Sequence, residues 1–174
     1  TNLVGKTDHL IIGGGMANTF LAALGKPMGR SLHEPHALGV ARRITDKAAA
    51  SGCEIVLPDD LVVAPALSAG VETRVVPAGD IPADAMALDA GPETITRIVA
   101  LLGTCRTLLW NGPLGAFEVA PFGDATFAVA RAAAQLTTGR RLTSIAGGGD
   151  TVAALNAAGV TSHFTYVSTA GGAF

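Results

Sequence analysis

The sequence has few of the residues that mark disulfide-bonded or nucleic-acid-binding proteins. Only two of its 174 residues are cysteines, Cys53 and Cys105. They stand apart, which favours buried free thiols over a disulfide or a metal site. Aromatic residues make up 5% of the chain and the net charge is −2. Neither a stacking platform nor a broad positive field is present, so we expect no nucleic-acid partner.

Long apolar runs are also missing, although 49% of the residues are hydrophobic. Gly, Pro or polar residues interrupt every apolar stretch before it reaches the roughly 18 residues that cross a bilayer. No basic region followed by an apolar segment and a small-residue cleavage site opens the chain. We therefore expect no membrane partner and a cytoplasmic location.

Apolar runs typical of strands alternate with alanine-rich stretches typical of helices. This order predicts one α/β domain, a three-layer αβα sandwich with a mainly parallel, Rossmann-like sheet. The predicted strands are residues 9–12, 54–57, 61–64, 74–76, 107–110, 142–145 and 164–167. The predicted helices are residues 16–24, 36–51, 93–102, 123–136 and 151–158. Residues 66–88 read as a loop-rich excursion with short strands.

Glycines mark both helix ends and strand ends. Gly52, Gly103 and Gly159 each follow a predicted helix, where a left-handed residue is favoured, and Pro92 suits a first helical turn. Three further glycine clusters end apolar runs, in residues 11–15, 145–151 and 166–172. Such turns let backbone N–H groups converge on an anion, and the helix that follows adds its dipole. A polyphosphate ligand is the leading hypothesis.

The turn at residues 147–151 carries the sharpest signal. The amides of Gly148 and Gly149 suit a phosphate, Asp150 suits Mg²⁺, and the hydroxyl of Thr151 suits a phosphate oxygen. The same residues also fit an ordinary strand-to-helix turn in which Asp150 or Thr151 caps the helix.

The segment WNGPLGAFE, residues 110–118, follows a predicted strand and is rich in turn-forming residues. One interpretation is a structural loop with Trp110 in the core. The other places the loop beside a planar ligand, with Glu118 accepting hydrogen bonds from ribose hydroxyls. The density of special residues favours the second.

Four familiar sites lack their required spacing. Asn18 stands where a dinucleotide fingerprint needs its last glycine, and Gly5 to Thr7 precede a predicted strand instead of following one as a Walker A loop does. Pro35 interrupts the pair His33 and His36. No acid partner at a recognisable spacing supports a hydrolase triad.

Taken in order, these segments resemble the C-terminal, nucleotide-binding half of phosphoglycerate kinase over nearly the whole chain. The motifs are LIIGGGMANTFL (10–21), GRSLHE (29–34), LPDDLVVA (57–64), LDAGP (88–92), WNGPLGAFE (110–118), AGGGDTVAAL (146–155) and VSTAGGAF (167–174). Ala170 replaces a glycine found in many members, and Ala116 stands where valine is common.

The resemblance implies that residues 1–174 form the nucleotide-binding domain, with ATP or ADP and Mg²⁺ as ligands. The adenosine would contact four residues and the ribose a fifth: Gly15, Gly91, Gly112, Leu114 and Glu118. Phosphates would face Asn111, Gly148 and Gly149, Thr151 would contact a phosphate oxygen, and Asp150 would ligate the nucleotide's Mg²⁺. Catalytic stabilisation of the transferred phosphoryl group would come from Gly149, Gly171 and Gly172.

The family's reaction is reversible phosphoryl transfer between ATP and 3-phosphoglycerate. Members carry a Gly-Gly-Ala-Lys segment, a further lysine and an N-terminal acid-binding domain upstream of the present residue 1. We expect a monomeric parent enzyme, with 3-phosphoglycerate bound by that N-terminal domain, and a fragment that is inactive alone. A regulatory nucleotide-binding module without catalysis and a dinucleotide-dependent oxidoreductase are the alternatives.

Overall fold

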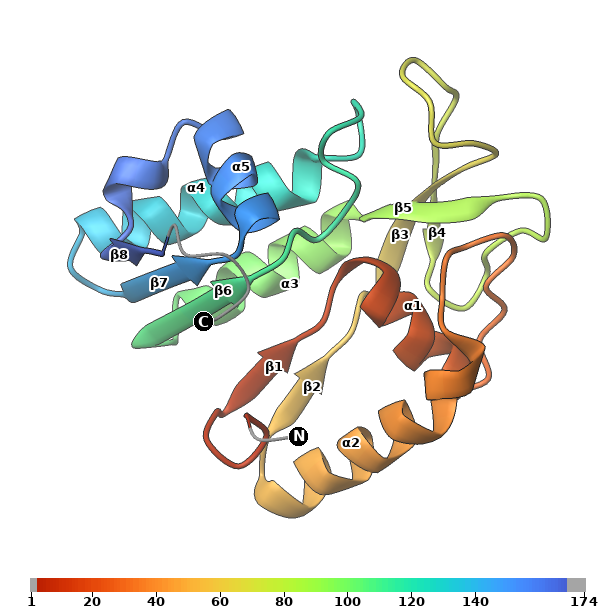
Figure 1. The fold of residues 1–174 in the computed structure, drawn as a ribbon, viewed down its shortest axis with the longest axis horizontal. Coiled ribbons are helices and arrows are strands. Elements are labelled where there is room, and N and C mark those ends of the chain that lie inside the picture. The colour runs from red at the N-terminus through yellow and green to blue at the C-terminus, as the bar shows by residue number, and fades with distance from the viewer. Residues whose placement is uncertain (1–2, 169–174) are drawn as a thin grey trace.

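Strands and helices alternate in the C-terminal part of the chain, whereas β2 to β5 follow one another without a helix between them (Figure 1). The computed structural model describes residues 3–168. The strands are β1 (His9–Ile11), β2 (Glu54–Val56), β3 (Asp60–Ala64), β4 (Arg74–Pro77), β5 (Met86–Ala90), β6 (Thr107–Asn111), β7 (Thr143–Gly147) and β8 (Tyr166–Val167). The helices are α1 (Gly14–Ala23), α2 (Leu38–Ser51), α3 (Pro92–Leu102), α4 (Asp124–Thr138) and α5 (Gly149–Ala157), with 3-10 turns η1 (Pro35–Ala37) and η2 (Thr161–His163).

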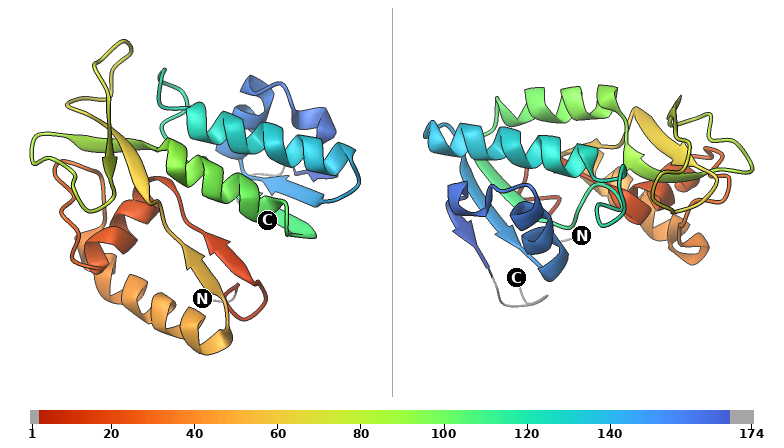
Figure 2. Two further views of the ribbon diagram at one scale, coloured as in Figure 1. Left: turned by 180° about the vertical axis from the view of Figure 1, so that it is seen from behind. Right: turned by 90° about the horizontal axis from the view of Figure 1, so that it is seen from above.

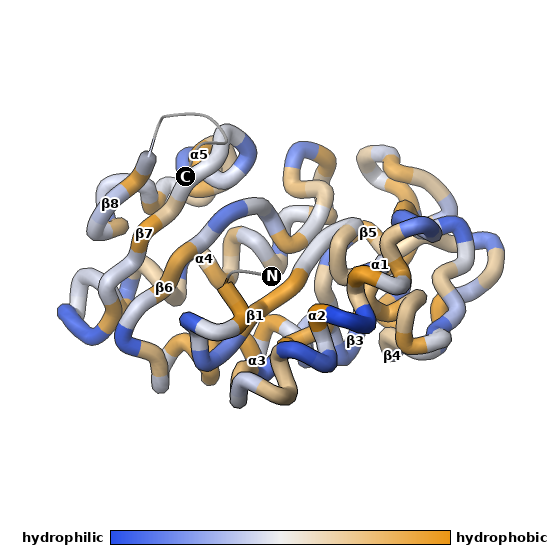
Figure 3. Tube along the Cα trace, turned by 60° about the horizontal axis from the view of Figure 1, so that its bottom comes forward, coloured by the Kyte–Doolittle hydropathy of each residue, from blue (hydrophilic) through white to orange (hydrophobic). Residues whose placement is uncertain are grey.

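The parallel strands form two hydrogen-bonded groups. β1 pairs with β2, and β6, β7 and β8 pair in that order, all in parallel. Figure 3 shows the labels β8, β7, β6 and β1 following one another across the molecule, with apolar colouring along β1, β6 and β7. Ile11 of β1 packs against the core cluster that contains Trp110 and Ala146. The two groups therefore share a core, and the predicted α/β fold with parallel strands flanked by helices is confirmed.

Helices cover the larger parallel group. α4 and α5 pack against each other and against β7, and α3 packs against α4 (Figure 2). Alanines of α4 make this close packing possible, since Ala125, Ala130 and Ala133 are fully buried. The connections from β6 through α4 to β7, and from β7 through α5 to β8, are crossovers between adjacent parallel strands.

A second, antiparallel sheet joins β4, β3 and β5 in that order. The sequence analysis predicts β3 and β4 but places most of β5 in a loop. β5 is a short strand stabilised by pairing with a segment more than 20 residues away, with a register shift between Val62 and Val63. Such long-range pairing leaves no local signal in a five-residue run.

The start of α3 is capped by a side chain from β3. Asp60 is buried, and its carboxylate accepts hydrogen bonds from the backbone N–H groups of Glu93 at 3.1 Å and Thr94 at 2.8 Å. The hydroxyl of Thr94 also donates to Asp60 Oδ1 at 2.7 Å. These bonds satisfy amides that a helix leaves unpaired at its start. They fix α3 to the antiparallel sheet.

Most predicted helix boundaries are confirmed within a few residues. Gly52 and Gly159 adopt left-handed backbone angles, with φ of 71° at each, and Pro92 lies in the first turn of α3. Gly103 was predicted to be left-handed, and this is wrong: its φ is −62°. The predicted helix 36–51 divides into η1 and α2, because Pro35 begins a separate turn. Among residues 3–168, no helix has both the length and the apolar character to cross a membrane.

Candidate functional site

The carboxyl ends of β1 and β6 meet at a reversal of strand order. The chain proceeds from β1 to β2 in one direction across the fold and from β6 to β8 in the other (Figure 1). The backbone N–H of Gly14, after β1, donates to the carbonyl of Leu114, after β6, at 3.0 Å. In open α/β folds, ligands bind outside the carboxyl ends of the strands at such a reversal. The turns that follow β1, β6 and β7 therefore make up the candidate site.

The turns after β6 and β7 are joined by direct contacts. The N–H of Gly112 donates to Thr151 Oγ1 at 2.7 Å, and the indole of Trp110 donates to the carbonyl of Gly112 at 2.6 Å. Gly112 and Gly148 both have positive φ, 94° and 92°. A Cβ on Gly148 would lie 2.8 Å from Asn111 Oδ1. These contacts join two segments that are more than 35 residues apart in sequence. Together they form one edge at the carboxyl ends of β6 and β7.

The N-terminus of α5 is open beside this edge. The first helical hydrogen bond runs from Val152 N to Gly148 O, so the preceding amides lie at the unpaired, positive end of the helix. Gly149 is exposed, and apart from its chain neighbours and the backbone of α5 no described atom lies within 4 Å of the place its Cβ would occupy. An anion can approach this backbone closely.

Asp150 and Thr151 occupy different environments within this turn. Asp150 is exposed in the first turn of α5, whereas Thr151 is 1% exposed and its oxygen accepts the Gly112 bond. Thr151 therefore links two turns instead of capping α5. Its predicted contact with a phosphate oxygen stays a prediction, and the geometry adds a structural role that the sequence analysis did not anticipate.

The turn after β1 is filled by protein instead. A Cβ on Gly13 would lie 2.7 Å from Leu114 Cδ2 and 3.0 Å from Leu114 Cα, and the Gly14 amide is already bonded to that residue. Leu114 is buried. Gly13 and Gly14 are thus explained by the close approach of the β6–α4 segment.

Gly15 lies at the exposed side of the same turn. Leu32 Cδ2 lies 3.6 Å from the position of a Gly15 Cβ, and Leu32 is 80% exposed. The neighbouring Met16 is 65% exposed. Two exposed apolar side chains beside a glycine offer a surface for a planar apolar group. The sequence analysis did not single out Leu32 or Met16, because nothing in the local pattern marks a leucine as exposed.

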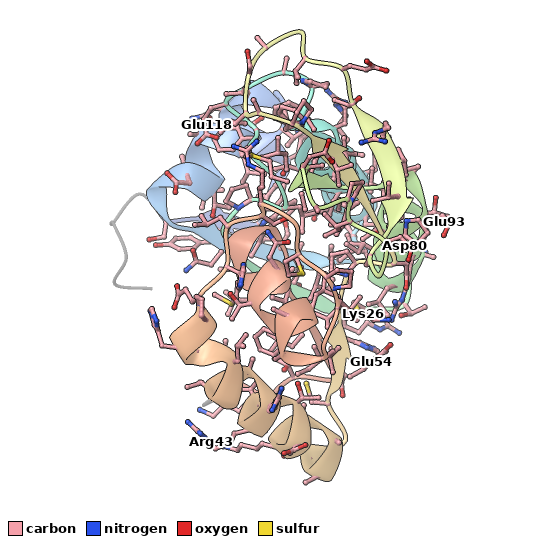
Figure 4. The ribbon with its side chains drawn as sticks, turned by 90° about the vertical axis from the view of Figure 1, so that its right-hand side faces the viewer. Lys26, Arg43, Glu54, Asp80, Glu93 and Glu118 are labelled. Atoms are coloured by element: carbon pink, nitrogen blue, oxygen red, sulfur yellow. The ribbon has the colours of Figure 1, made fainter. Side chains whose placement is uncertain are left out.

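Gly91 has a packing role in this structure. A Cβ there would overlap the carboxylate of Asp60, the residue that caps α3, and the Gly91 amide donates to Asp60 O at 2.9 Å. The adenosine contact expected of Gly91 stays a prediction. Glu118 lies exposed on the segment between β6 and α4, at the opposite end of the view from Arg43 in Figure 4. Gly171 and Gly172 fall outside the described residues.

The residues suit a magnesium ion carried by a phosphate ligand. In the part of the chain that the structure describes, no group of three or more His, Cys, Asp or Glu side chains could hold a metal. Mg²⁺ is typically held by one or two carboxylates together with substrate phosphates. The exposed carboxylate of Asp150, beside the open end of α5, is one carboxylate of this kind.

A buried acid supports the segment between β6 and α4. Asp89, at the end of β5, is 3% exposed and lies directly beneath Gly115. Burial raises its pKa to about 7, and the nearby charge of Asp124 adds to the rise. Hydrogen bonds from the amides of Ala125 and Ala90 act in the opposite direction and lower the pKa. The sequence analysis includes Asp89 in a motif but assigns it no role.

Comparisons with known proteins place this geometry in a family. A model of the family described as phosphoglycerate kinase matches residues 1–174. The phosphoglycerate kinases of Sphingopyxis alaskensis and Dinoroseobacter shibae are 60% and 58% identical over 173 residues, which cover 99% of this chain and 44% of each relative. The chain thus spans less than half the length of these curated relatives.

Solved structures agree with the sequence comparison. Phosphoglycerate kinase from Coxiella burnetii superimposes with a TM-score of 0.94 at 41% identity, covering 98% of this chain and 43% of that one. The Pyrococcus horikoshii enzyme gives a TM-score of 0.73 at 23% identity, covering 98% and 42%, a likeness of fold.

Proposed function

Because the chain belongs to the phosphoglycerate kinase family, we propose that residues 1–174 are the nucleotide-binding part of an enzyme that transfers a phosphoryl group between ATP and 3-phosphoglycerate. The observation that carries the proposal is the open N-terminus of α5. There, exposed Gly149 and Asp150 lie beside Asn111 and Gly148 at the joined edge of β6 and β7.

The polyphosphate would lie across this edge. Amides at the start of α5 would donate to phosphate oxygens, with Asn111 adding side-chain contacts, and the helix dipole would favour the negative charge. Asp150 would hold the nucleotide's Mg²⁺, which neutralises phosphate charge when bound. Gly149, Gly171 and Gly172 would stabilise the transferred group by backbone hydrogen bonds.

The nucleoside would extend from the phosphates toward the turn after β1. Leu114 and Gly112 define the segment between the two turns, and the exposed side chains of Leu32 and Met16 beside Gly15 supply apolar contact for the base. Glu118 would accept hydrogen bonds from the ribose hydroxyls. Gly91, in the turn between β5 and α3, would also contact the adenosine.

The protein's contribution to catalysis would be positioning and charge stabilisation, since phosphoryl transfer asks little covalent chemistry of the enzyme. The acid substrate would bind to a part of the parent enzyme outside these residues. We therefore expect this chain alone to bind Mg-ADP or Mg-ATP without measurable transfer to 3-phosphoglycerate. The parent would act in the cytoplasm, in glycolysis, as a monomer.

Calorimetric titration of Mg-ADP into the wild-type chain and the Asp150→Ala variant tests the proposal. Loss of a charged ligand to the metal predicts a roughly ten- to hundredfold weaker affinity in Mg²⁺. With EDTA in place of Mg²⁺, the two proteins should bind ADP equally weakly. The exposed Asp46→Ala variant of α2 is the control for lost surface charge. Unchanged affinity and metal dependence in Asp150→Ala would refute the metal role of Asp150.

A wild-type chain that binds NAD but not ADP would favour the oxidoreductase alternative. Binding of Mg-ADP without any transfer by the full-length parent would favour a regulatory module.

A further inference from the structure

We propose that Asp89 is a positioning residue for the candidate nucleotide site, because its buried carboxyl group fastens the end of β5 to the start of α4 beneath residues 112–118. The inference rests on the proposed nucleotide-binding role of that segment. Asp89 itself touches none of the residues placed at the phosphates.

The carboxyl group of Asp89 bridges two elements. Its Oδ1 accepts a hydrogen bond from the N–H of Ala90 at 2.9 Å, and its Oδ2 accepts one from the N–H of Ala125 at 3.0 Å. Ala125 lies in the first turn of α4 and is fully buried. Asp89 therefore caps the start of α4 as Asp60 caps the start of α3. In each case a carboxylate on a strand accepts a hydrogen bond from a backbone N–H that the helix leaves unpaired.

The segment between β6 and α4 wraps closely around this carboxyl group. A Cβ on Gly115 would overlap the Asp89 side chain and would lie 2.6 Å from the carbonyl oxygen of Phe122. The next amide, that of Ala116, donates to the carbonyl of Leu88 at 2.9 Å. Only a glycine fits between the acid and the returning chain.

A second attachment lies on the other side of Gly115. The N–H of Leu114 donates to Thr126 Oγ1 at 3.0 Å, in the same turn of α4 that Asp89 holds. Leu114 is therefore bonded directly to the fixed start of α4, and Glu118 lies in the same segment on the other side of Gly115. A shift of the carboxyl group would move both candidate nucleotide contacts together.

The same burial makes this attachment sensitive to pH. The pKa of Asp89 is raised from 3.8 to about 7, chiefly by desolvation, and Asp124 is the charged group among the described residues that adds to the rise. A raised pKa means that the protonated acid favours the folded state. That contribution is complete below pH 4 and is lost as pH rises toward and through 7. Above pH 7 the buried carboxylate is stabilised by hydrogen bonds from the backbone N–H groups of Ala125, Ala90 and Asp124.

Amide NMR titration of the chain tests the attachment without any nucleotide. The N–H signals of Ala90 and Ala125 should shift together with a midpoint near pH 7, and Asp89→Asn should abolish this shift. Asp124→Asn should lower the midpoint while leaving the shift in place, because it removes a repelling charge. Signals of Ala90 and Ala125 that stay at their wild-type positions in Asp89→Asn at every pH would overturn the inference.

Hydrogen exchange tests whether Asp89 positions the segment. In Asp89→Asn an amide group must face one of the two N–H donors, so exchange at residues 112–118 should accelerate about tenfold or more. Exchange in β7 should change little. Asp84→Asn, which removes an exposed charge near the start of β5, is the matched control. Equal exchange in the two variants would contradict the proposal.

Gly115→Ala provides a second route if Asp89→Asn folds poorly. The added methyl group should displace the segment from Asp89 and accelerate exchange in the same residues. Both changes disrupt the same contact, that between Asp89 and Gly115. Residues 112–118 of the double variant should therefore exchange little faster than in the more affected single variant. Fully additive effects would show that Asp89 and Gly115 act independently.

Mg-ADP titration separates this inference from the proposed function. Asp89→Asn should weaken Mg-ADP several-fold at pH 8, where Asp84→Asn should not. Failure of the wild-type chain to bind Mg-ADP would refute the proposed function. Wild-type binding that persists unchanged in Asp89→Asn, despite faster exchange at residues 112–118, would refute positioning by Asp89 alone.

Discussion

The turn after β1 and the turn after β7 have similar glycine-rich sequences but opposite surroundings. At the first, Leu114 fills the space beside Gly13 and takes the hydrogen bond of Gly14. At the second, Gly149 is exposed with open space around it, at the free end of α5. Glycine at the first turn permits chain to pack against chain. At the second turn, Gly148 packs against Asn111 in the same way, and Gly149 leaves room for a ligand.

A glycine cluster in a sequence can therefore belong either to a packed turn or to an open turn. The sequences IIGGGM and IAGGGD each end a parallel strand and begin a helix. What separates them is a residue far away in the chain, Leu114, which occupies one turn and not the other. Phosphate binding is therefore assigned by the space around a turn and not by its glycine count.

The largest effect in this comparison is expected for Gly13→Ala. Its Cβ would press on both the side chain and the backbone of Leu114, so we expect the free energy of unfolding to fall by about 1–3 kcal/mol. Gly149→Ala is the matched control, at a helical position with open space, and should change stability by less than about 1 kcal/mol. Urea unfolding followed by Trp110 fluorescence measures both. Similar losses in the two variants would remove the distinction between a packed and an open turn.

Thr151→Val is expected to have an intermediate effect. It keeps the shape of a buried side chain but leaves the Gly112 amide without its acceptor, which should cost about 1–2 kcal/mol of stability. Mg-ADP affinity should also fall, because Gly112 and Asn111 lose their link to α5. Thr96→Val, at an exposed hydroxyl of α3, is the control. Unfolding and titration of both variants check this, and wild-type behaviour of Thr151→Val would show that the two turns are not coupled.

The smallest effect is expected for Glu118→Gln. The side chain is exposed, so stability should stay within about 0.5 kcal/mol of wild type. If Glu118 accepts ribose hydrogen bonds, loss of its charge should weaken ADP about fivefold and leave inorganic tripolyphosphate unaffected. Parallel calorimetric titrations with the two ligands make the comparison. An equal loss of affinity for ADP and for tripolyphosphate would place Glu118 near the phosphates instead of the ribose.

Much of the fold follows from local sequence patterns. The alternation of apolar strands with helices predicted parallel strands flanked by helices, and the boundaries of α3 and α5 were close because Pro92 and Gly159 act locally. β5 was missed because its pairing with β3 is a long-range interaction. Gly103 was misassigned because a residue that follows a helix need not be left-handed, and its amide bonds within the preceding turn.

Part of the candidate site was also predictable, because local sequence patterns place some of its residues. Asn111 ends β6, and Gly148 and Gly149 follow β7. The parallel order of these strands brings their ends together, which a sequence can indicate. The partner of Thr151, the filling of the first turn by Leu114 and the exposure of Leu32 depend on contacts between distant segments. Asp89 escaped notice because its role comes from burial beneath Gly115.

Amide NMR with magnesium tripolyphosphate tests most directly whether the open turn binds phosphate. This probe carries no nucleoside, so shifts report the phosphate site alone. We predict the largest shifts at Gly148, Gly149 and Asp150 and little change at Gly13 and Gly14. Shifts centred on Gly13 and Gly14, or none in the turn after β7, would contradict the account.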